Sequence, residues 1–112
     1  MKIAIPIVQN KVSVHFGHCE QFALFEVDKE TKEIINKEFL PCPPHHPGML
    51  PKWLGEKGAD IIIASGMGRR AQNMFNQYGI EVVLGSPSGE PEDIVSEYIN
   101  GTLETGDNIC DH

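Results

Sequence analysis

Six side chains of metal-binding type fall into two short clusters of this chain: His15, His18 and Cys19, followed by Cys42, His45 and His46. Thiolate and imidazole groups are ligands for zinc, copper and iron–sulfur species, so all six are candidate metal ligands. Six donors exceed the four that close a tetrahedral zinc site. The surplus favours a multinuclear or anionic metal species, or an open site that exchanges its cargo.

Neither cluster has the spacing of a zinc finger, and ordinary structural roles remain open for these residues. Cys19 and Cys42 are also consistent with buried thiols, because cysteine is often buried without a chemical role. His15 and His18 are consistent with loop histidines that are exposed or hydrogen-bonded. The metal interpretation is strengthened only if folding brings the two clusters together.

A glycine turn supplies a second candidate site. The segment Ser-Gly-Met-Gly at residues 65–68 follows an apolar strand and leads into a helix. Gly66 and Gly68 allow backbone amides to approach a ligand at the positive end of the helix dipole, where Arg69 favours an anion. Gly66, Met67, Gly68 and Arg69 are therefore candidate cofactor-binding residues. A plain strand-to-helix turn would explain the same glycines.

The chain ends in a further pair of potential ligands, Cys110 and His112. Three cysteines are an odd number, and each stands within three residues of a histidine, which suits metal better than a disulfide framework. The last helix is expected to leave the tail at the far edge of the sheet, but about ten extended residues at ~3.3 Å each would span back. The tail is therefore long enough for Cys110 and His112 to reach the other candidate ligands, but its length does not establish that they bind metal.

Length and charge limit the possible functions. At 112 residues the chain is the size of one domain, which we place at residues 1–104, with a flexible tail at residues 105–112. The net charge of −7 argues against nucleic acid or an anionic membrane as the main partner. No apolar run approaches the ~18 to 20 residues of a membrane span, and no signal-peptide pattern follows Met1, so we expect a cytoplasmic protein.

The hydrophobic pattern predicts three strands followed by alternating helices and strands. The three strands are expected at residues 2–8, 22–27 and 33–40, the last at an edge, with a loop at residues 9–21. Pro6 lacks a backbone donor, so the first strand should bulge there or leave that position unpaired. The second half predicts helix, strand, helix, strand and helix at residues 49–57, 59–64, 69–78, 80–84 and 91–100. We therefore expect an α/β fold of order βββαβαβα, with a five-stranded mixed sheet whose second strand is antiparallel.

This order of elements sends four connections to the same edge of the sheet. If the first strand runs upward, the loops at residues 9–21 and 41–48, the glycine turn, and residues 85–89 all lie at the top. Open α/β sheets usually place their ligand crevice at such an edge. We therefore expect the two clusters of histidine and cysteine to share one crevice with the glycine turn.

With these residues in place, the chain resembles the dinitrogenase iron–molybdenum cofactor biosynthesis family over about residues 1–104. The resemblance rests on five segments: the opening Lys-Ile-Ala-Ile-Pro, His-Phe-Gly at residues 15–17, Gly-Ala-Asp-Ile-Ile-Ile-Ala at residues 58–64, the Ser-Gly-Met-Gly turn, and Gly-Ile-Glu-Val at residues 79–82. It implies a three-layer ribonuclease-H-like fold and a small cytoplasmic carrier or chaperone for an iron–molybdenum or related metal–sulfur cluster. Relatives of the orange-protein branch hold a molybdenum–copper–sulfur cluster.

The sequence departs from the family's usual pattern in its ligands. Where the family commonly has arginine after His-Phe-Gly, this chain has His18 and Cys19. Its Cys-Pro-Pro-His-His segment at residues 42–46 is also richer in ligands than the family pattern. These departures support metal binding, and they leave the cargo open among iron–molybdenum, molybdenum–copper and zinc species.

A non-enzymatic carrier is the function that these observations favour. It would bind a metal–sulfur cluster in the crevice lined by cysteine and histidine, and exchange it with a donor or recipient protein. The alternative is a regulatory module that binds a small molecule or oxyanion at the turn containing Gly66 and Gly68. Nuclease activity, which a ribonuclease-H-like architecture suggests, is disfavoured because the first strand carries no acid and Asp28 is expected at the opposite edge.

Overall fold

The fold is given by a computed structural model that describes residues 1–12, 20–41, 49–86 and 89–106. Within these ranges the elements in chain order are β1 (Lys2–Val8), β2 (Lys11–Val12), β3 (Gln21–Asp28), β4 (Glu33–Pro41), α1 (Met49–Glu56), β5 (Ile61–Ile63), α2 (Arg69–Gln77), β6 (Glu81–Val83) and α3 (Pro91–Asn100). None of the helices in the described ranges is long and apolar enough to cross a membrane.

The strands form one mixed sheet in the order β4-β3-β1-β5-β6, and the short strand β2 pairs with β1. β3 runs antiparallel to both β1 and β4. β5 runs parallel to β1, and β6 runs parallel to β5. The α/β class, the antiparallel second strand and the edge position of residues 33–40 are therefore confirmed.

Among the described residues the sheet has six strands rather than the predicted five, because β2 lies in a segment that we expected to form a loop. Gln9 and Asn10 connect β1 to β2 with φ angles of 53° and 65°. Two central residues with positive φ make a tight hairpin turn that matches the twist of paired strands. The usual Asn-Gly or Asp-Gly signal for this turn is absent, which explains why the sequence pattern did not predict it.

Of the two outcomes expected at Pro6, the bulge does not occur against β3, because β1 and β3 stay in uninterrupted register. The carbonyl of Lys2 accepts a hydrogen bond from the N–H of Asp60, on the β5 side of the strand. Backbone groups point to alternate sides along a strand, so the ring nitrogen of Pro6 faces the same side. β5 pairs only with Ile3 and Ala4, and the missing donor therefore falls beyond the end of that pairing.

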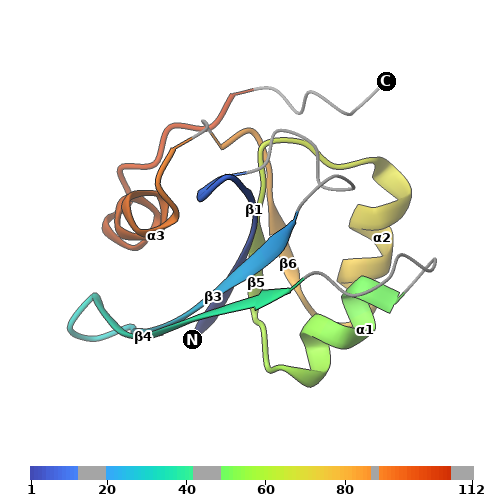
Figure 1. The fold of residues 1–112 in the computed structure, drawn as a ribbon, viewed down its shortest axis with the longest axis horizontal. Helices are drawn as coiled ribbons and strands as arrows, with labels where there is room; N and C mark the ends of the chain where they lie inside the picture. Colours follow the sequence, from blue (N-terminus) through green and yellow to red (C-terminus); the bar gives the residue numbers. More distant parts are fainter. Residues whose placement is uncertain (13–19, 42–48, 87–88, 107–112) are drawn as a thin grey trace.

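Helices cover both faces of the sheet, which gives three layers, with α3 on one side and α1 and α2 on the other (Figure 1). Alternate residues of β1 point to opposite faces. The α3-side core joins strand residues to the helix: Ile3, Ile5, Ile7, Ala23, Phe25, Ile94 and Val95. The opposite core contains Ala4, Phe22, Leu24, Ile62, Leu50, Leu54 and Phe75. Burial on both faces explains why β1 and β5 are almost entirely apolar.

Most predicted boundaries agree with the structure to within one or two residues. α3 spans Pro91–Asn100 as expected, with proline in its first turn and Gly101 as a left-handed C-cap at φ 76°. β5 and β6 are shorter than the predicted residues 59–64 and 80–84. Their ends still make strand-like hydrogen bonds, such as that from the N–H of Ala64 to the carbonyl oxygen of Val83 at 2.9 Å.

After α3 the chain turns back toward the upper edge of the sheet in Figure 1. Leu103 packs against the α3-side core. The N–H of Gly106 donates to the carbonyl oxygen of Gly85 at 2.7 Å. Gly106, which we expected to belong to a flexible tail, therefore lies against the loop that follows β6.

Candidate functional site

One edge of the sheet collects the connections that carry candidate chemistry. β1, β4, β5 and β6 end at this edge, and β3 begins there because it runs opposite to all of them. The predicted convergence is therefore confirmed for the strand ends that the structure describes. In open α/β sheets this is the edge where ligands usually bind.

The two clusters of histidine and cysteine are bounded by residues that pair with each other. Gln21, the first residue of β3, is the cross-strand partner of Pro41, the last residue of β4. The N–H of Glu20 donates to the carbonyl oxygen of Ile7 at 2.9 Å. The Glu20 carboxylate accepts a hydrogen bond from the N–H of Gln9 at 3.0 Å. These contacts fasten the start of β3 to the end of β1. In the sequence, the first cluster ends just before Glu20 and the second begins just after Pro41.

The candidate ligands themselves lie outside the described residues. They comprise every histidine and cysteine of the chain: His15, His18, Cys19, Cys42, His45, His46, Cys110 and His112. Within residues 1–12, 20–41, 49–86 and 89–106, no group of three or more His, Cys, Asp or Glu side chains is arranged to hold a metal ion. The meeting of the two clusters in one site therefore stays a prediction.

The glycine turn after β5 is fastened to the loop after β6. The Ser65 hydroxyl donates to the carbonyl oxygen of Ser86 at 2.7 Å, and the Ser65 carbonyl accepts from the N–H of Gly85 at 3.0 Å. The N–H of Ser86 donates to the carbonyl oxygen of Ala64 at 3.2 Å. Ser65 and Ser86 are both buried, so these bonds satisfy polar groups inside the protein and fix the two loops relative to each other.

The four candidate residues of the glycine turn differ in what they expose. The Met67 side chain is fully buried in the core shared with α1 and α2, so a contact with a surface ligand would fall to its backbone. Gly66 is buried, whereas Gly68 and Arg69 are exposed. A Cβ atom at Gly68 would meet no atom of the described residues within 4 Å. The cofactor-binding role of these four residues stays a prediction.

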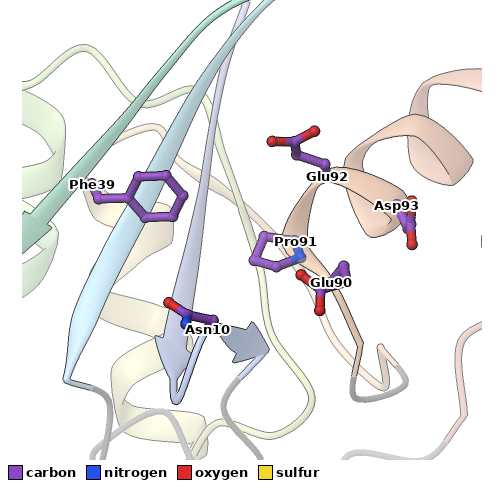
Figure 2. A pocket seen from close by; sticks show the side chains of 6 residues that line it. All are labelled: Asn10, Phe39, Glu90, Pro91, Glu92 and Asp93. Atoms are coloured by element: carbon purple, nitrogen blue, oxygen red, sulfur yellow. The ribbon is translucent and has the colours of Figure 1, made fainter.

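A groove that the sequence did not predict lies between β4 and the start of α3 (Figure 2). It has a volume of about 470 Å³, and six residues line it: Asn10, Phe39, Glu90, Pro91, Glu92 and Asp93. The Phe39 side chain points from β4 toward the start of α3. The sequence places an aromatic residue on an expected edge strand, but the approach of α3 to that residue is a tertiary property.

The fold and the gathered strand ends define a small three-layer α/β domain with a mixed sheet, of the kind that binds ligands at the carboxyl ends of its parallel strands. The family described as dinitrogenase iron-molybdenum cofactor matches residues 1–101. The chain belongs to this family, which confirms the resemblance found in the sequence. The family is cofactor-related and is not a known catalytic family.

Three similar proteins cover nearly the whole chain. The uncharacterized protein MJ0580 of Methanocaldococcus jannaschii is 35% identical in an alignment 110 residues long, and the match covers 93% of this chain and 90% of that protein. The crystal structure of PH0822 is 33% identical, with a TM-score of 0.86 and 94% of each chain covered. The apo form of the orange protein from Desulfovibrio gigas is 20% identical, with a TM-score of 0.71, and the match covers 96% of this chain and 93% of that one. At 20% identity, the likeness to the orange protein shows the fold alone.

Proposed function

We propose that this protein is a cytoplasmic, non-enzymatic carrier or chaperone for a metal–sulfur cluster of the iron–molybdenum or molybdenum–copper type. Membership of a family described by the iron-molybdenum cofactor supports a cofactor-related role. The ligands that we assign to the cluster are His15, His18, Cys19, Cys42, His45 and His46. The role requires a partner protein that donates or receives the cluster.

The pairing of Gln21 with Pro41 is the observation that supports a shared site. Cys19 precedes Gln21 by two residues, and Cys42 directly follows Pro41. Paired Cα atoms of antiparallel strands are about 5 Å apart, so the ends of β3 and β4 from which the two clusters continue lie side by side. This proximity of the flanking residues supports a common cargo for both clusters at the end of the β3–β4 pair.

The donor set suits a metal–sulfur cargo better than a hard cation. Thiolates are soft ligands that hold copper(I) and iron–sulfur species, and imidazole suits copper, iron and zinc. Thiolates and sulfides bring negative charge, which the N-terminus of α2 and the exposed Arg69 at the same edge would stabilise. In this proposal two loops supply ligands and the glycine turn supplies positive potential.

Reconstitution without oxygen tests the proposal. We expect protein incubated with iron and sulfide, or with copper and tetrathiomolybdate, to retain metal and sulfur after desalting and to show visible charge-transfer absorption. Trp53, the single tryptophan, follows the second cluster by seven residues, and quenching of its fluorescence gives a second readout. Protein that retains neither metal nor colour would disprove the proposal. Retention of zinc alone, with no sulfur, would exclude a metal–sulfur cargo.

Serine variants locate the site. Cys19→Ser and Cys42→Ser should each reduce retained metal by at least about tenfold, because changing even the residues that support a metal ligand commonly costs this much. If both cysteines bind one cluster, the double variant should lose little more than either single variant. Cys110→Ser makes the same chemical change outside the two clusters and should leave the metal content unchanged. Equal losses in all three variants would indicate either that Cys110 also binds the cluster or that the metal binds thiols unspecifically.

A regulatory module that binds a small molecule or oxyanion at the glycine turn is a second candidate function. The observation that favours it is the exposed start of α2, where a Cβ atom at Gly68 would meet no atom of the described ranges within 4 Å and Arg69 is exposed. Equilibrium dialysis against nucleotides, molybdate and phosphate distinguishes it from the carrier. Saturable binding that survives both cysteine changes and is lost in Arg69→Ala would favour the module.

A further inference from the structure

The groove between β4 and α3 exposes an aromatic side chain on the sheet (Figure 2). Ile5 of β1, Ala23 of β3 and Phe39 of β4 are successive cross-strand partners on the α3-side face. α3 packs over β1, at the far end of this row, and Phe39 remains 46% exposed. An aromatic ring in this position offers apolar area that a binding partner would bury.

β4 is the outer strand of the sheet, and no strand in the described residues pairs with its outer side. Its nine residues make a long edge, and long edges expose unpaired backbone donors and acceptors. Ile35 of the same strand is 62% exposed, and a second hollow of about 370 Å³ follows residues 34–37. An edge of this kind accepts an extended segment as an additional strand.

The α3 side of the groove is negatively charged. Glu90, Glu92 and Asp93 line it, and all three are exposed. Lys37 of β4, which lines the second hollow, forms an ion pair with Glu92, which lines both the hollow and the groove. Three carboxylates against one ammonium group leave a net negative potential beside Phe39, and a positively charged partner would neutralise it.

We propose that this groove, together with the outer edge of β4 beside it, is the docking site of an extended, positively charged segment of a partner protein. The segment would pair with the outer side of β4, place an apolar side chain beside Phe39, and direct a lysine or arginine to Glu90 and Asp93. Backbone pairing supplies affinity in strand addition, while the apolar and charged side chains select the partner and its orientation.

A second copy of this chain does not fit these requirements. Each copy carries a net charge of −7, so two copies repel each other. β4 has Lys37 as its one basic residue, and this lysine already pairs with Glu92. Paired β4 strands would therefore bring no new positive charge to Glu90 and Asp93.

The groove reaches the edge that carries the candidate ligands, because Asn10 of the β1–β2 turn lines it. A segment bound there would hold its parent protein beside that edge. A role of the groove in cluster transfer rests on the proposed function, whereas binding of the segment does not. The two can be tested separately, since the groove requires no metal.

Peptide binding to metal-free protein tests the docking site. The probe is a fluorescent eight-residue peptide in which lysine alternates with valine and phenylalanine, compared with the same peptide carrying glutamate for lysine. We expect saturable binding of the lysine peptide alone, weakening as salt is raised. Amide shifts in ¹⁵N–¹H spectra should concentrate on β4 and the first turn of α3. Methylation of alternate peptide nitrogens should abolish binding, because it removes the donors that pair with β4.

Substitutions with matched controls test which side chains of the groove contact the peptide. Phe39→Ala should weaken binding by at least about tenfold, as expected for an aromatic side chain at the centre of an interface. Phe39→Leu should regain part of the lost affinity. If the alanine variant misfolds, the leucine variant still tests the contact. Tyr78→Ala removes an aromatic ring of similar exposure, 49%, at the end of α2, and should have no effect. The pair Glu90→Gln and Asp93→Asn should reduce affinity and its salt dependence, whereas Glu30→Gln with Glu56→Gln should not.

Three results would overturn the docking proposal. The first is absence of binding to the wild-type protein. The second is an equal loss of affinity in the groove variants and their matched controls, which would show that the peptide responds to net charge alone. The third is a concentration-dependent shift of β4 amides without peptide, which would identify a second copy as the occupant. None of these results bears on metal retention, so the reconstitution experiment would still decide whether the protein is a carrier.

Discussion

At the scale of single residues, Tyr98 of α3 links the last helix to the last strand. Burial raises the pKa of the Tyr98 hydroxyl above its ordinary value of 10.0, and the nearby carboxylate of Glu81, which accepts a hydrogen bond from it, raises the pKa further. The folded protein therefore favours the protonated hydroxyl more than the unfolded chain does. The stabilisation is fully present below pH 10 and is lost as the pH rises through the higher pKa of the folded state.

Tyr98→Phe removes this hydroxyl and should lower the free energy of unfolding at neutral pH by about 0.5–1.5 kcal/mol, the usual net value of a hydrogen bond. Above pH 10 the wild-type protein should lose stability more steeply than the variant, so the difference between them should shrink. Urea unfolding between pH 7 and pH 11 measures both effects. Tyr78→Phe removes a hydroxyl from an exposed tyrosine and serves as the control. A difference for Tyr98→Phe that stays constant across this range would contradict the assignment.

At the scale of elements, the loop after β6 and the segment after α3 meet through two glycines. Gly85 has φ 80°, and a Cβ atom there would lie 2.0 Å from the carbonyl oxygen of Gly106. A Cβ atom at Gly106 would lie 3.9 Å from the carbonyl oxygen of Gly85, an ordinary contact. The contact therefore requires glycine at position 85 but not at position 106, so alanine substitutions at the two positions form a matched pair.

Gly85→Ala should lower the free energy of unfolding by about 2–4 kcal/mol, because it combines a left-handed backbone with a backbone clash. Gly101→Ala, at φ 76° with no atom of the described part of the chain within 4 Å of its Cβ position, should show the backbone effect alone, about 1 kcal/mol. Gly106→Ala should change stability by less than about 0.5 kcal/mol. Thermal unfolding ranks the three variants, and hydrogen exchange at the Gly106 amide reports whether the segment detaches. Equal costs at Gly85 and Gly101 would show that the contact with Gly106 contributes nothing.

At the scale of the whole molecule, the sequence predicted the order of elements and the edge where their connections gather. It did so because the apolar runs of β1, β3 and β5 and the glycines after the helices are local signals. It missed β2, whose Gln9 and Asn10 turn carries no glycine, and it missed the groove. Exposure of Phe39 depends on where α3 lies across the sheet, and the contact of Gly106 with Gly85 joins segments that no short-range pattern relates. The assignment of the candidate metal ligands rests on their residue types and on the pairing of two residues near the ends of the clusters, Gln21 with Pro41.

Three shortened chains test how far the folded unit extends. A chain ending at residue 106 keeps the packing of Leu103 and the hydrogen bond from Gly106 to Gly85, so it should unfold within about 0.5 kcal/mol of the full chain. A chain ending at residue 101 loses both contacts, together with the hydrogen bonds that the N–H groups of Thr102 and Leu103 donate to the carbonyl oxygen of Glu97. It should be less stable by about 1–3 kcal/mol through lost apolar burial and lost hydrogen bonds. A chain ending at residue 104 keeps the packing of Leu103 and the hydrogen bonds to Glu97 but loses the hydrogen bond from Gly106, so its stability should fall between the other two. Urea unfolding of the three chains measures these differences. If the chain ending at residue 104 matched the full chain, the contact of Gly106 with Gly85 would be dispensable and the unit would end where the sequence predicted.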